Sequence, residues 1–335
     1  MIQLDSLWSD YNRPDLSARA NTFSTWNKLD SAERRKEVLN DPGITTYSEK
    51  EVGYQFNSFG FRSEELENVE GLKILYTGCS VTEGIGLPVE HTWNHHLNQH
   101  ISAEIGDDVK MFNIGKAGSS IDACIRFTYI TVEHKKFRPD LVFFLIPPIN
   151  RNELVYTMPN SFEWLDFAPS NQRFKNHHER GLFHHYMNMI TPLQRFNEAI
   201  RNLLFFKSFL DSKGIPFILS TWCSARIHDI IPGVTIPQYS LFKNYFPEEL
   251  AKHFVTVPFI QDAQKPVTKA KLTPEICFKP NYENFEYKYP YNIARDGIHL
   301  GPNTNWNFAR DLFDELKQRN DFLVLLNEKS RIHRV

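Results

Sequence analysis

Five residues in four short segments have the types that serine-dependent catalysis uses. Ser80 stands in TGCSVTEG, Gly118 in FNIGKAGSS and Asn150 in IPPINRNE, while Asp296 and His299 share the segment ARDGIHLGPN. A serine hydroxyl becomes a nucleophile when a neutral imidazole takes its proton, and a carboxylate can fix the tautomer of that imidazole. Each residue alone also fits an ordinary turn or helix cap, where serine, glycine and asparagine are common.

The elements around these segments alternate between buried strands and helices. Near-continuous apolar runs predict strands at 72–77, 109–114, 140–146, 215–222 and 254–260. Helical spacing predicts helices at 89–101, 119–137, 191–213 and 304–318. The third of these begins with Thr191 as the cap, Pro192 at the first helical position and Gln194 in a capping box. Apolar strands separated by helices indicate a parallel sheet that is covered on both faces.

The four segments each lie where they can meet at one edge of that sheet. Three of them directly follow predicted strands, and the fourth precedes the helix at 304–318. The carboxyl ends of parallel strands project from the same edge, where open α/β sheets bind their ligands. The set therefore favours one site over several unrelated turns and caps.

In this order, the four segments resemble the sequence blocks of the SGNH (GDSL-type) hydrolase superfamily. The resemblance covers about 72–155 and 290–318, and 190–222 by pattern only. It includes an opening in which a Gly-x-Ser turn is followed by Thr-x-Gly, and the upstream FNSFGFRSEE looks like a lead-in found in some branches. The resemblance implies an α/β fold of three layers, flavodoxin-like, with a central parallel sheet of about five strands and insertions after strand ends.

The resemblance also implies an activity and a role for each residue. It implies ester hydrolysis through an acyl-enzyme, with Ser80 as the nucleophile, His299 as the general base and Asp296 orienting the histidine. The backbone N–H groups of Ser80 and Gly118, with the side-chain amide of Asn150, would form the oxyanion hole. A short acyl ester of acetyl type, with a carbohydrate O-acetyl group as the leading case, is the substrate that the family suggests.

Two positions depart from the family pattern. Cys79 stands where the family commonly has aspartate, and Arg151 follows Asn150 where the family has Gly-x-Asn-Asp. Neither change removes an implied catalytic group, but both alter the lining of the site. Arg151 and Cys79 are therefore candidate substrate contacts, with a surface position and a small buried residue as the respective alternatives. The Gly-x-Ser-x-Gly elbow of α/β-hydrolases is not met, since position 82 is threonine.

The chain divides into a predicted N-terminal extension and a hydrolase-like domain. We expect residues 1–70 to pack on a core formed by 71–330, which contains irregular insertions at 151–190 and 224–294. Long irregular segments in a compact domain are usually functional loops or small insertions. Whether these two form a lid is left open.

Composition limits the partners and the compartment. The 335 residues carry a net charge of −2 with scattered Lys and Arg, which argues against nucleic acid. The sequence shows no signal peptide and no run long enough for a membrane span, and its four cysteines form no C-x-x-C pair, so we expect a cytoplasmic protein without disulfides. His96 and His100 lack a third ligand, so neither a metal nor another cofactor is predicted.

Three alternatives stay open beside the serine esterase. The same fold and residues would serve a lipid or thioester hydrolase, or an acyltransferase. A non-catalytic binding or structural protein could also keep the fold. The oligomeric state is not predicted.

Overall fold

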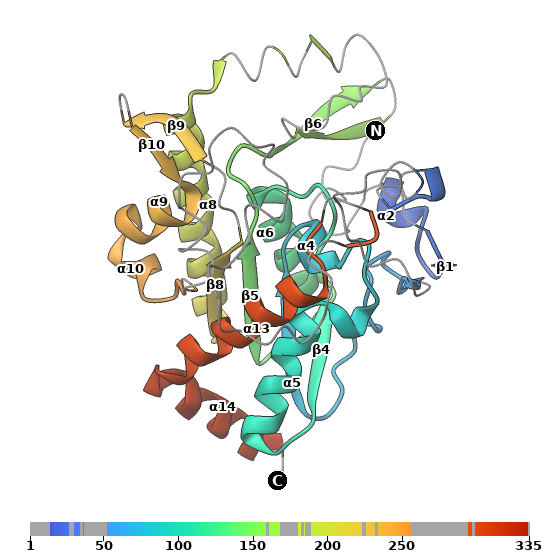
Figure 1. The fold of residues 1–335 in the computed structure, drawn as a ribbon, viewed down its shortest axis with the longest axis vertical. Helices are drawn as coiled ribbons and strands as arrows, with labels where there is room; N and C mark the ends of the chain where they lie inside the picture. The colour runs from blue at the N-terminus through green and yellow to red at the C-terminus, as the bar shows by residue number, and fades with distance from the viewer. Residues whose placement is uncertain are drawn as a thin grey trace.

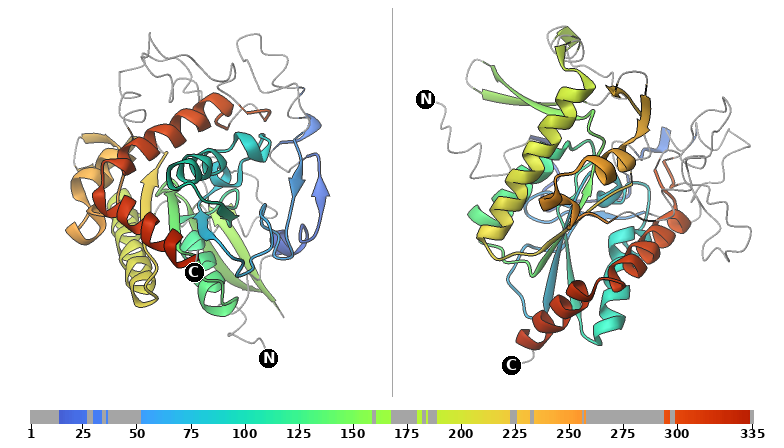
Figure 2. Two further views of the ribbon diagram at one scale, coloured as in Figure 1. Left: turned by 90° about the horizontal axis from the view of Figure 1, so that it is seen from below. Right: turned by 90° about the vertical axis from the view of Figure 1, so that its left-hand side faces the viewer.

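The chain folds around a parallel β-sheet with helices on both of its faces (Figures 1 and 2). The computed structural model describes residues 14–26, 30–33, 36, 52–158, 161–167, 180–181, 184, 189–222, 226–231, 234–255, 257, 294–296 and 299–333. None of the described helices is long and apolar enough to cross a membrane.

The central sheet has four parallel strands in the order β4-β3-β5-β8. These are β3 (Leu72–Thr77), β4 (Val109–Asn113), β5 (Leu141–Ile146) and β8 (Phe217–Thr221). The chain passes from β3 to β4 on one side and then returns to β5 on the other. This reversal makes the carboxyl end of β3 the point at which the strand order switches, which is where ligands of such sheets bind.

The sheet confirms the fold that the sequence predicts. Every residue of β3, β5 and β8 is buried, as expected for strands covered on both faces. Beyond β8, Phe254 forms a single parallel bridge with Leu219, with Val255 N donating to Leu219 O at 2.8 Å. This bridge marks the place of the predicted fifth strand at 254–260, of which 256 and 258–260 lie outside the described residues.

One face of the sheet is covered by α5 (Trp93–Ile105), α13 (Pro302–Lys317) and α14 (Asn320–His333). Aromatic rings join the layers: Tyr76 of β3 stacks on Phe143 of β5, with ring centroids 5.5 Å apart. Trp93 meets the edges of Tyr76 and Phe308 at 5.4 and 5.6 Å, so α5 and α13 are packed on the same part of the sheet.

The other face is covered by α6 (Ile121–Tyr129), which continues as a π-helix over Ile130–His134, and by α8 (Pro192–Ser212). The predicted start of α8 is confirmed, because the Thr191 hydroxyl accepts a hydrogen bond from Gln194 N at 3.1 Å. Phe206 of α8 lies between Phe144 and Phe217, at 5.2 and 5.5 Å between ring centroids. The sheet and its helices therefore form three layers.

The two stretches that the sequence leaves irregular contain regular elements. The first holds the hairpin of β6 (Asn152–Met158) and β7 (Ser161–Phe167). The second holds the hairpin of β9 (Arg226–Ile231) and β10 (Val234–Pro237), followed by α9 (Gln238–Tyr245) and α10 (Glu248–Ala251). These elements lack the long apolar run or long helical period that identifies the core, so the sequence alone does not reveal them.

The remaining short elements surround the carboxyl edge of the sheet. They are α2 (Pro14–Ser17), the pair β1 (Phe23–Ser24) and β2 (Tyr54–Gln55), α4 (Ser80–Glu83) and a 3-10 turn at Val89–His91.

Truncation of Phe206 should weaken the core. Phe206 is fully buried between two strand aromatics, so Phe206→Ala should lower the free energy of unfolding by about 3–5 kcal/mol. Its neighbour Phe205 is 51% exposed, and Phe205→Ala should cost less than about 1 kcal/mol. Guanidinium-induced unfolding of both variants measures the difference, and equal losses would contradict this packing.

Candidate active site

Ser80 lies at the end of β3, where the strand turns into α4. It is the first residue of that short helix and is 3% exposed. The turn leaves no room for a side chain at Gly78, because a Cβ there would overlap Thr82 Oγ1 and come within 3.0 Å of the Leu145 carbonyl. Glycine at this position therefore lets the chain bring Ser80 close to the end of β5.

Asp296 and His299 form a pair within one loop. Asp296 Oδ2 accepts a hydrogen bond from His299 Nδ1 at 2.5 Å, and its Oδ1 accepts one from the backbone N–H of His299 at 3.1 Å. The aspartate is fully buried, whereas the histidine side chain is 14% exposed. A carboxylate held in this way keeps the proton on Nδ1 and leaves Nε2 as the basic nitrogen.

The Asp-His loop is docked on the turn that follows the serine helix. Arg295 N donates to the Gly86 carbonyl at 3.0 Å. Gly86 has a φ of +76°, and a Cβ there would lie 2.9 Å from Ala294 Cβ and 3.1 Å from Asp296 N. The close approach requires glycine and places the loop beside the turn that ends α4. Within the described chain, Ser80 and His299 are not themselves joined by a hydrogen bond.

Two further candidate residues follow β4 and β5, the strands on either side of β3. Gly118 lies between β4 and α6 with a φ of +84°, and Asn150 lies in the turn after β5. The backbone N–H groups of Ser80 and Gly118 donate to no acceptor among the residues that the structure describes. They are available as hydrogen-bond donors at the carboxyl edge of the sheet.

The Gly118 loop is tied to the serine helix by side chains that sequence reasoning missed. Asn113 donates from Nδ2 to the Thr82 carbonyl at 2.7 Å and accepts from Gly115 N at 2.8 Å. The buried Glu83 accepts a hydrogen bond from Ala117 N and pairs with Arg19. A single sequence gives no signal for these contacts, since Asn and Glu are common in turns and short helices.

The Asn150 turn is held by a buried glutamine from a distant part of the chain. Gln238, the first residue of α9, accepts from Ile149 N at 2.9 Å and donates to the Pro147 carbonyl at 3.0 Å. It also donates to Thr221 Oγ1 at 3.3 Å. Both ends of the amide are used, so the turn that carries Asn150 is fixed from two sides.

A buried polar network links residues before position 70 to the Asp-His loop. Asp30 is fully buried and accepts from Arg295 Nη2 at 2.6 Å and Nε at 3.0 Å, and from the Tyr54 hydroxyl at 2.6 Å. Tyr54 in turn accepts from Gly86 N at 2.8 Å. Burial, together with the Asp30 carboxylate, holds the pKa of Tyr54 far above its usual value, so the phenol stays a donor.

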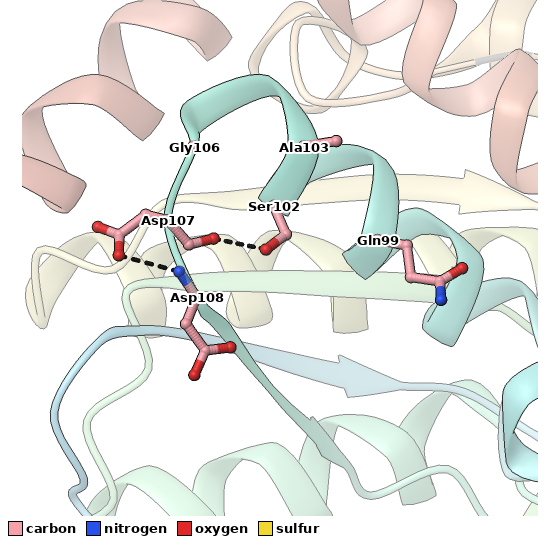
Figure 3. Close-up of a pocket in the computed structure, with 6 residues that line it drawn as sticks. All are labelled: Gln99, Ser102, Ala103, Gly106, Asp107 and Asp108. Atoms are coloured by element: carbon pink, nitrogen blue, oxygen red, sulfur yellow. Dashed lines mark hydrogen bonds between the residues drawn. The ribbon is translucent and has the colours of Figure 1, made fainter.

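The two positions that depart from the family pattern have different environments. Cys79 is fully buried beneath the serine turn. Arg151 is partly exposed and lines a pocket beside the Asn150 turn. Another hollow lies at the opposite edge of the sheet, between the end of α5 and the start of β4 (Figure 3). It is lined by Gln99, Ser102, Ala103, Gly106, Asp107 and Asp108, none of them a candidate site residue.

The described residues hold no cluster of three or more His, Cys, Asp or Glu side chains that could bind a metal ion. The described groups near this edge include the Ser80 hydroxyl and the His299 imidazole, which is hydrogen-bonded to Asp296.

Comparison with known proteins finds similar structures only. No family model and no curated protein matches the chain. The psychrotrophic esterase EstA from Pseudoalteromonas sp. is similar, with 13% identity, 74% of this chain and 98% of that chain covered, and a TM-score of 0.40. TesA has 15% identity, coverage of 73% and 98%, and a TM-score of 0.40. AlinE4, an SGNH-hydrolase family esterase, has 18% identity, coverage of 62% and 88%, and a TM-score of 0.37.

Loss of Asp30 should destabilise the protein through Arg295. Asp30→Ala leaves a guanidinium buried without its carboxylate, and breaking such a pair costs about 3–5 kcal/mol. Thermal unfolding should show a lowered midpoint, and the double variant Asp30→Leu/Arg295→Met should recover part of the loss. As a control, Asp108→Ala removes a carboxylate that is 73% exposed and should change stability little. A double variant no more stable than Asp30→Ala would contradict the unpaired charge as the cause.

Proposed function

We propose that the protein is a serine esterase that hydrolyses a short acyl ester, with a carbohydrate O-acetyl group as the leading substrate. Ser80 is the nucleophile, His299 the general base and Asp296 the residue that orients the base. The observation that carries this proposal is the hydrogen-bonded Asp296–His299 pair docked at Gly86, on the turn that follows the helix of Ser80.

The reaction uses each group in turn. Ser80 Oγ attacks the ester carbonyl carbon while His299 Nε2 takes the hydroxyl proton. The tetrahedral intermediate collapses, the alcohol leaves with that proton, and an acyl-enzyme remains. Water then gives its proton to His299 and attacks the acyl carbon, and the return of that proton to Ser80 releases the carboxylic acid.

The negative charge of the tetrahedral intermediate needs fixed donors. The N–H groups of Ser80 and Gly118 and the amide of Asn150 are the proposed oxyanion hole. Loss of one such donor typically costs about 10²–10³ in rate. Glu83 and Gln238, through Ala117 N and Ile149 N, hold residues next to two of these donors, which supports a preorganised hole.

Substitution of Ser80 tests the function. Ser80→Ala should lower kcat/KM for 4-nitrophenyl acetate by about 10³-fold or more, because no other group replaces the nucleophile. A fluorophosphonate should add one label to the wild type and none to Ser80→Ala. Cys79→Ala should still take up the label, since the Cys79 thiol is buried. Labelling that persists in Ser80→Ala would overturn the assigned nucleophile, and a wild type that takes no label would favour a non-catalytic protein.

A further inference from the structure

A charged pocket of about 310 Å³ lies beside the proposed oxyanion hole. It is formed by the start of α6, the turn between β5 and β6, and the first half of α8. Ile149 and Arg151, which flank Asn150, both line it, and Ile121 lines it three residues after Gly118. Its polar lining includes Asp122, Arg151, Asn152, Arg195, Glu198 and Arg201.

The pocket therefore lies next to two of the three proposed donors of the oxyanion hole. Residues near Gly118 and Asn150, two of the three proposed donors, form part of its wall: Ile121 near the first, and Ile149 and Arg151 beside the second. From this position we expect a group on the acyl or alcohol part of the substrate to enter the pocket when the carbonyl lies at Ser80.

The described lining of the pocket carries a positive formal charge. Three arginines face two carboxylates, and one of these, Glu198, already accepts a hydrogen bond from Gln194 at 2.9 Å. The neighbouring Glu153 does not add to the negative side, because it forms a buried two-point pair with Arg126 at 3.0 and 3.2 Å. Among the described lining residues, the formal charges of three arginines and two carboxylates therefore sum to one positive charge.

A second observation, separate from the formal charge of the lining, concerns the hydrogen bonds of Arg151. Its Nη1 atom is buried and has no hydrogen-bond partner within the described structure. Buried polar atoms are rarely left unpaired in folded proteins, and a guanidinium matches a carboxylate in two-point geometry. Arg195, which lines the pocket from α8, is only 8% exposed, so an anion held there would be partly removed from water.

We propose that this pocket binds an anionic group of the ester substrate, a carboxylate being the simplest case, so that the natural ester carries a negative charge near its carbonyl. The inference rests on the proposed esterase function and adds the substrate class. The alternative is that the arginines only stabilise the fold and bind no substrate, and the experiment must distinguish the two roles.

Two matched pairs of esters test the pocket. One pair places the charge on the alcohol side, 4-acetoxybenzoate against methyl 4-acetoxybenzoate. The other places it on the acyl side, the 4-nitrophenyl monoester of adipate against 4-nitrophenyl hexanoate. In at least one pair, kcat/KM should be about tenfold or more higher for the anionic ester than for the neutral one. A factor of this size is typical of a hydrogen bond to a charged group. The pair that responds identifies which side of the ester enters the pocket.

Variants then connect this preference to the arginines. Arg195→Gln should lower the anionic-to-neutral ratio about tenfold. Arg201 is exposed, so Arg201→Gln should fold normally and give a smaller loss. Lys243→Gln removes a positive charge from the exposed face of α9 and should leave the ratio unchanged. Absence of the preference in both pairs, or its persistence in both arginine variants, would overturn the proposal.

A binding measurement separates this proposal from the esterase itself. Adipate alone should bind the wild type in calorimetry and bind Arg195→Gln about tenfold more weakly. If no ester is hydrolysed but adipate binding depends on Arg195, the anion site stands and the esterase proposal fails. If neutral esters are hydrolysed but adipate binds neither protein, the anion site fails alone.

The preference should also depend on pH through Asp122. Burial, and then the nearby Glu153, raise the pKa of Asp122 to about 7. Below that pH the Asp122 carboxyl is neutral, and the described lining carries a formal charge of +2. Above that pH the carboxylate is ionised, and the formal charge of the described lining is +1. The anionic-to-neutral ratio should therefore fall as pH rises from about 6 to about 8. The charged groups around Asp122 are Arg126 on α6, Arg151 and Glu153 at the β5–β6 turn, and Arg195, Glu198 and Arg201 on α8.

Titration of the proposed triad changes kcat/KM for the anionic and the neutral ester by the same factor. It therefore cancels in the anionic-to-neutral ratio. Asp122→Asn should give a ratio that no longer changes between about pH 6 and 8. A ratio that rises with pH, or an unchanged slope in Asp122→Asn, would overturn the role of Asp122 in the charge of the pocket.

Discussion

The arrangement of the site depends on the buried ion pair between Asp30 and Arg295. The Asp30 carboxylate joins Arg295, next to Asp296, to Tyr54, which holds the backbone at Gly86. A charge buried in this way is costly unless it is paired, and Arg295 and Tyr54 supply that pairing. The Asp-His loop is therefore held on the turn after α4 by residues that come from three distant parts of the chain.

The order of the strands explains why the serine stands where it does. Because the chain leaves β3 for β4 on one side and returns to β5 on the other, connections diverge at the carboxyl end of β3. Ser80 lies at that point, with Gly118 and Asn150 after the two flanking strands. Nothing in the chemistry requires these residues to be near one another in sequence, since the sheet brings their loops together.

The sequence predicts the core well because the core has strong local signals. The apolar runs at 72–77 and 140–146 and the cap at Thr191 each correspond to an element in the structure. Asp296 and His299 are also found together, since three residues separate them. The sequence does not reveal Asp30, Glu83 or Gln238, because their partners are tens to hundreds of residues away and their types are ordinary at the surface. The hairpin β6–β7 is missed for a related reason: its antiparallel strands need no continuous apolar run.

The hydrogen bonds of Gln238 change how the segment after β8 should be regarded. Residues 224–294 look like a dispensable insertion, yet this segment supplies the glutamine that satisfies both Ile149 N and the Pro147 carbonyl. A shortened protein that kept only the sheet and main helices would lose the hydrogen bonds that hold this turn, although Ser80 and His299 would still be present. For protein engineering, this means that α9 should be kept when loops in this segment are exchanged, because Gln238 supports the turn after β5.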